Sequence, residues 1–554
     1  MASLTILDLP ERTLDSLKSR ADVNRGSMDG EKLYTLDYVV PGRSEFGIIR
    51  ENRIAKQKEA FRAVFASGRI PVPPRRSSRR SRGCAFRRTK GRAVILLDTN
   101  IIILIMQFSR LRDGSFWIGR LDWKFQGESV GLASCRAAGS AANEKGVILT
   151  GTITGATKAK ALEKDPFKPV EDGGVGEPNL PDCMIGNAAT AREAVTLLGA
   201  SVAEYGHAGA EIYMVADTNE AWYVEVYTGH HWAAVKMPAD KVAVFGNHFN
   251  LRGFDTNDTG NVMFSPGLVA HAVTNGFAVW ADVAQTKLDL YKTYADPDSV
   301  ETNYANYRAW YGHRRFADKD LPEYRMDLLP ELFFEPGYKL APTNMFELMR
   351  TRYEDMTDEE LPTPRTNAAI RVIGTVKQGN CHVLQLDCRE NTPDNMRGTV
   401  WSCLGNCEHG VFHPINASQD YLPAAYTNDA QRTFGYDPNR AADAFRRLSA
   451  LAQSNRKWYG PGVRAYWRAR EVQMAEEWPR NLSAAIASGI YTALWGYTRD
   501  EENKSFAAAK KLYDELIWYA VANNRITGDG SGATDEPLEP FKPSDGITSG
   551  RDLR

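Results

Sequence analysis

Cysteine and histidine side chains crowd the part of the sequence between residues 381 and 413, where a metal ion could bind. The set comprises Cys381, His382, Cys388, Cys403, Cys407, His409 and His413. Zinc ligands of this kind normally lie on turns, whereas most of these residues fall within predicted strands. Neighbours on a strand point to opposite faces, so Cys381 and His382 would diverge. The pattern favours ordinary buried thiols, and we expect neither a metal site nor a cofactor.

Other common catalytic motifs do not identify a catalytic site in this sequence. The sequence has no G-x-S-x-G elbow, and neither a phosphate-binding loop nor a dinucleotide fingerprint follows a predicted strand. The glycine-rich stretch GDGSG (528–532) lies near the end of the chain. A Ser-His-Asp triad stays open, because nine histidines are scattered along the sequence.

The stretch AWYVEVYTGHHWAAVKMPADKVAVFGNHFNL, residues 221–251, alternates apolar and polar residues as a strand pair does. It breaks at His230 and His231 and ends on Gly246 and Asn247. Strands built only for packing need none of these four residues. The stretch is therefore a candidate site for chemistry, and its surroundings decide whether these side chains can meet others.

Two groups of short strands and several helices must position these residues. Residues 190–206 have helical spacing, with Gly206 as a stop signal. The segments 211–217, 221–228, 231–236 and 242–247 are predicted as one antiparallel meander, and 369–375, 380–387, 399–405 and 410–415 as a second. A helical, aromatic insert spans 266–355.

The C-terminal part is predicted to be helical over 426–525. Asp437 is a suitable N-cap there, with Pro438 at the first helical position, and a further helix covers 505–524. Two meanders flanked by helices indicate an α+β protein with two packed antiparallel sheets and helical layers outside, over residues 110–425. Residues 526–554 are predicted to be a disordered tail.

Composition excludes few functions. The chain has 554 residues, 43% of them hydrophobic and 25% charged, with a net charge of −1. Nothing in this balance indicates nucleic acid or a membrane surface as a partner. Seven cysteines do not suggest a disulfide framework, and no signal peptide is recognisable at the start, so we expect a cytoplasmic protein.

Residues 1–109 differ from the rest and are interpreted as an atypical basic leader. They contain PVPPRRSSRRSRGCAFRRTKGR (71–92), and no acidic residue occurs between Phe61 and Leu97. Three readings stay open: a basic arm for nucleic acid, a solvated linker, or a mis-read gene segment that is no natural protein sequence.

Several long motifs resemble the bacterial dipeptidase A family, cysteine peptidases of the N-terminal nucleophile superfamily. They are 211–251, AANEKGVILTGTIT (141–154), GVGEPNLPDCMIGNAATAREAVTLL (174–198), NYRAWY (306–311), and IRVIGTVKQGNCHVLQL with WSCLGNCEHGVF (within 370–412). The resemblance covers roughly residues 110–525. It implies an αββα four-layer sandwich with a helical C-terminal extension, a small peptide as substrate, and no metal; it leaves homo-oligomerisation open.

The resemblance also implies site residues. An N-terminal cysteine would be the nucleophile and its α-amine the base. Asn247 would donate to the oxyanion and Arg308 would lie near the nucleophile, while His230 and His231 would shape the substrate pocket. The alternatives are a turn-capping amide for Asn247 and a surface ion pair for Arg308.

The match breaks at its beginning. LRDGSFWIGRLDWKF (111–125) resembles the segment after the nucleophile, with Arg120 and Asp122 as the charged pair beside it. Counting back from Arg120 by the family's spacing reaches Asn100 and Ile101, where no cysteine stands. Cys84 lies too far upstream and is only a weak candidate.

A dipeptidase that is inactive with this sequence is the resulting hypothesis. Two alternatives stay open: a peptide-binding pseudoenzyme of the same fold, and a nucleic-acid-associated protein acting through 71–92.

Overall fold

A computed structural model of the chain describes residues 94–98, 115–122, 134–137, 140–153, 155–297, 303–317, 321–325, 329–352, 380–419, 422–426, 437–523 and 539–544. The chain divides into two compact units, Met1–Arg82 and Gly83–Arg554, and every described residue belongs to the second. Cys84, Asn100, Ile101 and the basic segment 71–92 lie outside the described residues. The hypotheses attached to them stay predictions.

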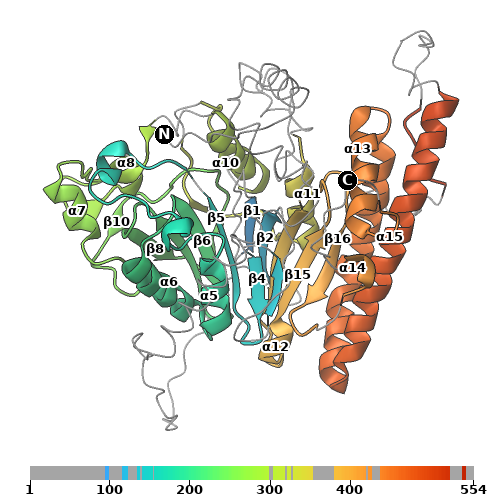
Figure 1. Cartoon of the computed structure of the whole chain (residues 1–554), viewed down its shortest axis with the longest axis horizontal. Coiled ribbons are helices and arrows are strands. Elements are labelled where there is room, and N and C mark those ends of the chain that lie inside the picture. The colour runs from blue at the N-terminus through green and yellow to red at the C-terminus, as the bar shows by residue number, and fades with distance from the viewer. Residues whose placement is uncertain are drawn as a thin grey trace, which may run out of the picture. The chain divides into compact units, whose positions relative to one another are not determined.

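The larger sheet is antiparallel throughout and forms the left half of Figure 1. Its strands run in the order β11-β8-β7-β6-β5-β4-β3. They are β3 (Ser134–Ala137), β4 (Ser140–Asn143), β5 (Ile148–Ile153), β6 (Glu211–Ala216), β7 (Ala221–Val226), β8 (Trp232–Lys236) and β11 (Val262–Phe264). The first three strands of the predicted first meander are thus confirmed.

The fourth strand of that meander was predicted wrongly. Residues after 241 form only the short β9 (Val242–Ala243), which leaves the sheet and pairs with β13 (Phe333–Phe334). Its predicted place beside β8 is taken by β11. A second small pair joins β10 (Phe254–Asp255) to β12 (Lys287–Leu288). Because the chain leaves the larger sheet before β9, the segment that carries Asn247 is not a strand of that sheet.

The second sheet has the order β1-β2-β14-β15-β16. Its strands are β1 (Val94–Asp98), β2 (Ser115–Asp122), β14 (Asn380–Asp387), β15 (Gly398–Cys403) and β16 (Phe412–Asn416). The predicted strands 380–387, 399–405 and 410–415 are confirmed as β14, β15 and β16, and the predicted strand 369–375 lies outside the described residues. β2 pairs with β14 in antiparallel, but β1 pairs with β2 in parallel, which corrects the expectation of a purely antiparallel sheet. β1 also lies inside the range interpreted as a leader.

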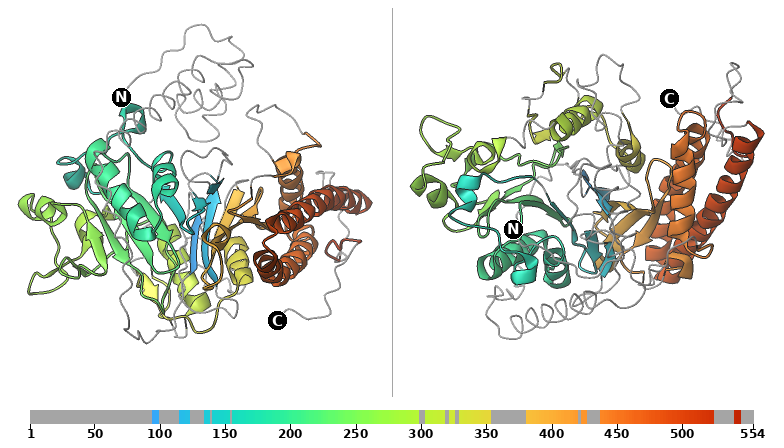
Figure 2. Two further views of the ribbon diagram at one scale, coloured as in Figure 1. Left: turned by 90° about the horizontal axis from the view of Figure 1, so that it is seen from below. Right: turned by 45° about the horizontal axis from the view of Figure 1, so that its top comes forward.

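The two sheets face each other, and helices cover the outer face of each (Figure 2). α5 (Leu180–Asn187) and α6 (Ala191–Tyr205) pack on the larger sheet. α6 follows its sequence pattern closely, because Thr190 caps it and the residues at helical spacing from Ala191 to Val202 are buried. Gly206 then ends it with φ of 74°, a conformation that favours glycine.

Several shorter helices and turns lie in the connections between strands or after the last strand. They are α4 (Ala159–Leu162), α7 (Leu268–Thr274), α8 (Leu290–Tyr294), α10 (Asn303–Phe316), α11 (Pro342–Arg350), α12 (Asp394–Arg397) and the 3-10 turns Val170–Asp172 and Ala424–Tyr426. α7, α8, α10 and α11 fall within the predicted helical insert. The α+β class is therefore confirmed.

The second sheet is covered by α13 (Ala441–Ser454), α14 (Gly460–Ser488) and α15 (Tyr491–Ala522), of which α14 and α15 pack on β16. The N-cap of α13 is Arg440, so the prediction of Asp437 at that position is wrong. The carboxylate of Asp437 instead accepts from Asn439 N, 2.9 Å away, in a turn before the helix. The local pattern of an acid before proline suits a turn as well as a helix start.

Part of the predicted disordered tail is ordered. Residues 539–544 run along the helices, and Phe541 is buried there, with its N–H donating to the carbonyl of Trp458 at 2.8 Å. A Cβ at Gly462 would lie 2.0 Å from the carbonyl oxygen of Phe541, so only glycine leaves room for this segment. The aromatic side chain supplies the burial that the polar composition of the tail conceals.

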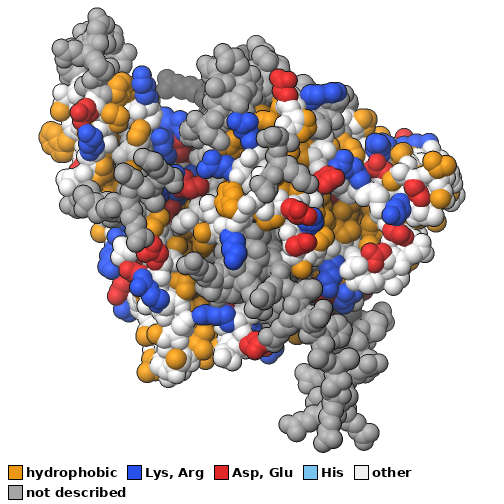
Figure 3. Space-filling view, turned by 180° about the vertical axis from the view of Figure 1, so that it is seen from behind, with side chains coloured by type: hydrophobic (Ala, Val, Ile, Leu, Met, Phe, Trp, Pro, Cys, Tyr) orange, Lys and Arg blue, Asp and Glu red, His pale blue; other side chains and the backbone are white. Residues whose placement is uncertain are grey.

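Alternation along β14 explains why one strand serves two cores. Leu384 and Leu386 pack between the sheets with Met214 and Tyr223 of the larger sheet, whereas Val383 packs with the helices on the other face. None of the described helices combines the length and apolar character that crossing a membrane requires. Lysine, arginine and acidic side chains alternate over the face shown in Figure 3.

Candidate functional site

Asn247 and Arg308 were both predicted as site residues, and although they are far apart in the sequence, they are in contact in the structure. Arg308 Nη2 donates to Asn247 Oδ1 at 3.0 Å. Arg308 lies on α10 and is only 1% exposed, while Asn247 follows β9 and is half-buried. The guanidinium is buried, so the alternative of a surface ion pair does not hold for Arg308. Catalytic roles for the two residues stay predictions.

Tight turns hold the backbone around Asn247. His248 N donates to Gly246 O at 2.9 Å across a single residue. Gly155 has φ of 128°, and a Cβ on it would lie 3.3 Å from His248 Cα and 3.6 Å from the carbonyl oxygen of Asn247. Glycine at 155 therefore lets a second segment approach Asn247 closely.

The contact with Arg308 fixes which end of the Asn247 amide accepts. Arginine has only donors, so the amide oxygen must face it and the amide nitrogen must face elsewhere. Next to them His248 is buried, and its burial, together with the positive charge of Arg308, lowers its pKa to about 4. At neutral pH the site thus combines a permanent cation, a neutral imidazole and an oriented amide donor. Such donors can stabilise a developing oxyanion.

A buried carboxylate anchors the segment that follows Asn247. Glu225 accepts from Tyr223 Oη at 2.6 Å, from Tyr227 Oη at 2.7 Å and from Asn250 N. Asn250 Nδ2 in turn donates to His248 O at 2.7 Å. Burial raises the pKa of Glu225 to about 7, although these hydrogen bonds oppose the rise.

Sequence analysis missed Glu225, but a signal was present. Residues 223, 225 and 227 alternate as Tyr-Glu-Tyr, so that all three side chains point to one face of β7. The alternate residues Trp222, Val224 and Val226 are apolar, which indicates a strand buried on both faces, so a carboxylate between two hydroxyl donors there would have indicated a buried network.

Arg120 and Asp122 lie on β2, with Arg120 opposite His382 and Asp122 opposite Asn380 of β14. Their side chains lie outside the described residues, so the structure describes only their backbone pairing. β1, which pairs with β2, lies beside β9. β1 therefore lies between β2, whose sequence resembles the segment after the family's nucleophile, and the strand that leads to Asn247.

His230 and His231 belong to a different cluster, at the turn between β7 and β8. His230 Nδ1 and Asp165 Oδ1 are 2.7 Å apart, which orients the exposed imidazole. Burial opposes ionisation of Asp165, but hydrogen bonds from His230 and Thr228 outweigh it and lower its pKa. Asp165 was not predicted, since nothing near it in the sequence indicates a histidine partner.

His231 faces the other way. Its ring lies 4.4 Å from that of His271, centroid to centroid, and its Nδ1 is 3.2 Å from Ser265 Oγ. Burial and the neighbouring His271 lower the pKa of His231 to about 4. A substrate-pocket role for His230 and His231 stays a prediction.

The cysteines and histidines between 381 and 413 do not form a metal centre. Cys381 pairs with Cys403 across β14 and β15, yet no disulfide joins these two described residues, and burial raises the pKa of Cys403 well above its usual value. Across the part of the chain that the structure describes, no group of three His, Cys, Asp or Glu side chains could hold a metal ion.

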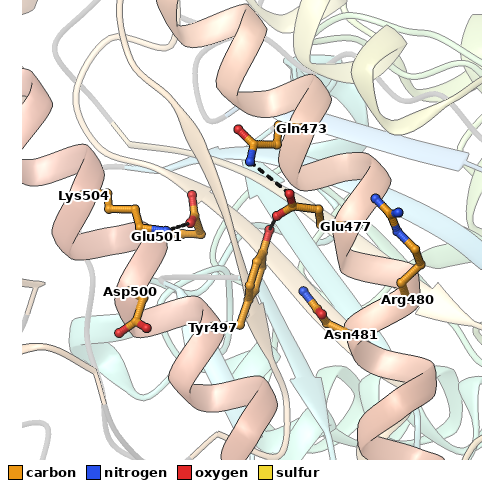
Figure 4. Close-up of a pocket in the computed structure, with 8 residues that line it drawn as sticks. All are labelled: Gln473, Glu477, Arg480, Asn481, Tyr497, Asp500, Glu501 and Lys504. Carbon is orange, nitrogen blue, oxygen red and sulfur yellow. Dashed lines mark hydrogen bonds and ion pairs between the residues drawn. The ribbon is translucent and has the colours of Figure 1, made fainter. Parts of the chain in front are cut away.

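A cavity of about 540 Å³ lies away from these residues, between α14 and α15 (Figure 4). Polar side chains of both signs line it, including Glu477, Arg480 and Lys504. Tyr497 Oη donates to Glu477 at 3.0 Å, and Lys504 Nζ to Glu501 at 2.7 Å, so the lining groups pair with one another. None of the predicted site residues lines this cavity.

Comparison with known proteins gives a consistent set of relatives. Residues 131–469 match the model of the family described as Peptidase family C69. A probable dipeptidase of Latilactobacillus sakei is 27% identical over 358 residues, 63% of this chain and 70% of that protein. A probable dipeptidase of Salmonella dublin is 28% identical over 51% of this chain and 61% of its own length. The probable dipeptidase B of Lactococcus lactis subsp. lactis is 27% identical, over 56% of this chain and 64% of its own.

Proposed function

The chain belongs to peptidase family C69, and we propose that it is a cysteine-type dipeptidase by descent whose peptide site is built around Asn247 and Arg308. The observation that carries this proposal is the 3.0 Å hydrogen bond between these two residues. They are separated by 61 positions, yet the fold brings the arginine of NYRAWY onto the asparagine at the end of the 211–251 motif. Short peptides are the proposed ligands.

The arrangement of the layers supports an N-terminal nucleophile architecture. Two facing sheets carry α5 and α6 on one side and α13, α14 and α15 on the other. In an αββα sandwich of this type, the proposed nucleophile would open a strand of one sheet beside the cleft. The proximity of β1 to β9 is in keeping with that position.

The proposed chemistry uses a thiol and the α-amine of the same residue. The amine takes the proton of the thiol, the sulfur attacks the peptide carbonyl carbon, and the amine returns the proton to the departing amino group. Water then hydrolyses the thioester. Asn247 donates from its amide nitrogen to the carbonyl oxygen as that oxygen becomes negative, which is a contribution of about 3 kcal/mol in comparable sites. Arg308 orients the amide and adds positive charge.

The nucleophile is the element that this sequence does not supply at the expected position. Asn100 and Ile101 stand where the family resemblance places the cysteine and the residue after it. We therefore expect the chain to bind short peptides but to hydrolyse none. This is the pseudoenzyme alternative, favoured by that one observation.

Two measurements on the full chain separate binding from hydrolysis. Calorimetric titration with dipeptides should show saturable binding, and amine release should stay at the level of buffer alone. Asn247→Ala should weaken binding about five- to tenfold, because it removes a hydrogen-bond donor, whereas Asn257→Ala at an exposed turn should not. Hydrolysis above the buffer level would overturn the predicted inactivity, and equal binding by both variants would overturn the proposed site.

A further inference from the structure

The cavity between α14 and α15 has a polar lining and opens to solvent. Its volume of about 540 Å³ lies within the range of roughly 300–1,000 Å³ that is usual for small-molecule sites. The side chains of Asp500 and Lys504, which line it, are 59 and 62% exposed, so a ligand can reach the cavity from outside. Because the lining offers charges and hydrogen bonds but little apolar surface, it suits a small hydrophilic ligand.

Two facing rows of side chains produce this polar lining. Residues three or four apart lie on one face of a helix, and where two helices pack in a soluble protein such rows are normally apolar. Here the rows are Gln473, Glu477 and Arg480 on α14, and Tyr497, Glu501 and Lys504 on α15. The space between the two helices is therefore hydrophilic.

Three of the charged groups in the lining are already engaged in ion pairs. Glu501 accepts from Arg470 Nη2 at 2.5 Å and from Lys504 Nζ at 2.7 Å. Asp500 Oδ1 lies 3.3 Å from Arg499 Nε. These three groups are bound to other parts of the protein and are not the first choice of a ligand.

Glu477 and Arg480 differ from them, because only neutral groups orient their charges. Glu477 accepts from Gln473 Nε2 at 2.9 Å and from Tyr497 Oη at 3.0 Å. Arg480 Nε donates to the backbone carbonyl of Glu476 at 3.1 Å. Among the residues that the structure describes, neither Glu477 nor Arg480 forms an ion pair, and Figure 4 shows no interaction between the two. One negative and one positive charge in the same cavity are thus held in place without being neutralised.

Both groups keep hydrogen-bonding capacity for a ligand. An ionised carboxylate has about four lone-pair sites and a guanidinium about five N–H donors, of which Glu477 and Arg480 use only a part within the described residues. Asn481, the next residue on α14, adds an amide to the lining. Positions 477 and 480 are neighbours on the helix surface, with Cβ atoms about 5–6 Å apart. A single small molecule can therefore contact both charges.

We propose that this cavity binds a small zwitterion that carries one ammonium and one carboxylate group. The ammonium donates to Glu477, and the carboxylate accepts from the Nη groups of Arg480, which match it in a bidentate pair. Such a ligand satisfies both charges and adds no net charge to the cavity. A free α-amino acid and a dipeptide share this chemistry. The cavity is separate from the proposed peptide site at Asn247, so either site can exist without the other.

Saturation-transfer nuclear magnetic resonance on the full chain tests the proposal with three probes of similar shape. Alanine carries both charged groups, isopropylamine has a methyl group in place of the carboxylate, and isobutyrate has one in place of the ammonium. We expect saturable binding of alanine with Kd of about 1 mM, and binding of the other two at least about tenfold weaker. Displacement of alanine by alanyl-alanine gives the affinity of the dipeptide for the same cavity, and the tighter of the two identifies the source.

Substitutions of the two charged residues should act on different probes. Glu477→Gln should weaken alanine binding about tenfold and leave isobutyrate unchanged, because it removes only the partner of the ammonium. Arg480→Gln should weaken alanine binding similarly and leave isopropylamine unchanged. Loss of folding cannot imitate this crossed pattern. Arg499→Gln, at an exposed position outside the lining, is the matched control and should have no effect.

Asn247→Ala separates this cavity from the peptide site, because it should leave alanine binding unchanged. Retained alanine binding in that variant, together with its loss in Glu477→Gln, supports the proposal even if dipeptides fail to bind at Asn247. Absence of saturable alanine binding, equal binding of the three probes, or an equal loss in the Arg499→Gln and Arg480→Gln variants would overturn it. So would loss of alanine binding in Asn247→Ala alone.

Discussion

The larger sheet and the C-terminal helices bury polar groups in opposite ways. In the sheet, Asn143 makes four hydrogen bonds through its amide, to Ile185 O, Ala188 O, Lys145 N and Val147 N, and Glu225 accepts from three donors. Around the C-terminal helices, buried charged groups instead form ion pairs, as Arg350 and Glu471 do at 2.7 Å.

The helical region also leaves groups incomplete. His413 Nε2 and Glu502 Oε2 are buried there without a hydrogen-bond partner among the described residues. Networks of short-range hydrogen bonds fix geometry, which is what a site at Asn247 requires. A buried ion pair instead depends on both of its members, because removing one leaves the other charge buried without compensation. Substitutions in both regions test whether they stabilise buried polar groups in these different ways.

The largest effect is expected from the buried ion pair. Arg350→Met leaves Glu471 charged, 1% exposed and without its guanidinium, which should lower the free energy of unfolding by about 3–5 kcal/mol. Urea denaturation followed by circular dichroism measures the change.

The double substitution Arg350→Met with Glu471→Leu should recover part of that loss, because no unpaired charge then remains. The exposed pair of Glu539 and Lys542 is the matched control, and Glu539→Gln should leave stability unchanged. A loss for Arg350→Met no larger than for this control would contradict the view that charges hold the helical region.

A smaller effect is expected for Glu225→Leu. Tyr223 Oη, Tyr227 Oη and Asn250 N would lose their shared acceptor, at a cost of about 3 kcal/mol. Urea denaturation at about pH 5, where most of the contribution of Glu225 is present, measures this loss, and Glu204→Leu at an exposed position of α6 is the control. Dipeptide binding should weaken as well, since Asn250 no longer holds the segment after Asn247. Unchanged stability would show that the network is dispensable.

The same carboxylate predicts a pH dependence. The pKa of Glu225 is about 7 in the folded chain against 4.5 for an ordinary glutamate, so the folded state binds more protons between these values. Its stabilising contribution is present below pH 4.5 and is lost as the pH rises through about 7. Glu225→Gln should flatten that part of the stability curve.

Glu502 sharpens the contrast. Burial raises its pKa to about 8, although Glu225 is buried at least as deeply. The hydrogen bonds from Tyr223, Tyr227 and the backbone of Asn250 and Leu251 account for the lower pKa of Glu225, because they favour its charged form. In Glu502→Gln the change of slope should therefore extend to a higher pH than in Glu225→Gln, and coinciding windows would refute this explanation.

The smallest effect concerns helix ends. Thr190 Oγ1 accepts from Glu193 N at 3.1 Å, whereas α14 begins without any side-chain cap. Thr190→Ala should cost about 1 kcal/mol in thermal or urea unfolding. Thr196→Ala, at an exposed mid-helix position of α6, is the control. Equal effects at both positions would indicate that the hydrogen bond at Thr190 has no capping value.

Local patterns in the sequence predicted the helices and strands whose formation depends on residues close together in the chain. The buried face of α6 and the strands β6, β7 and β8 follow from spacing alone. The pairing of β9 with β13 joins residues about ninety positions apart, and short strands carry too few residues to show a pattern. The burial of Phe541 likewise depends on a glycine in α14.

The candidate site divides in the same way. Asn247 and Arg308 were singled out by resemblance to a family, since no local rule joins them across 61 positions. Asp165 was missed because its partner His230 lies on a separate element, and a single acidic residue looks like solvated surface in the sequence.

Phe541 can pack in its observed position only when residue 462 is a glycine. One added methyl group at 462 would displace residues 539–544 from the helices, and with them the aromatic lid over Trp458 and Tyr519. A fluorescent label attached at Ser544 would report through its anisotropy whether residues 539–544 remain packed on the helices.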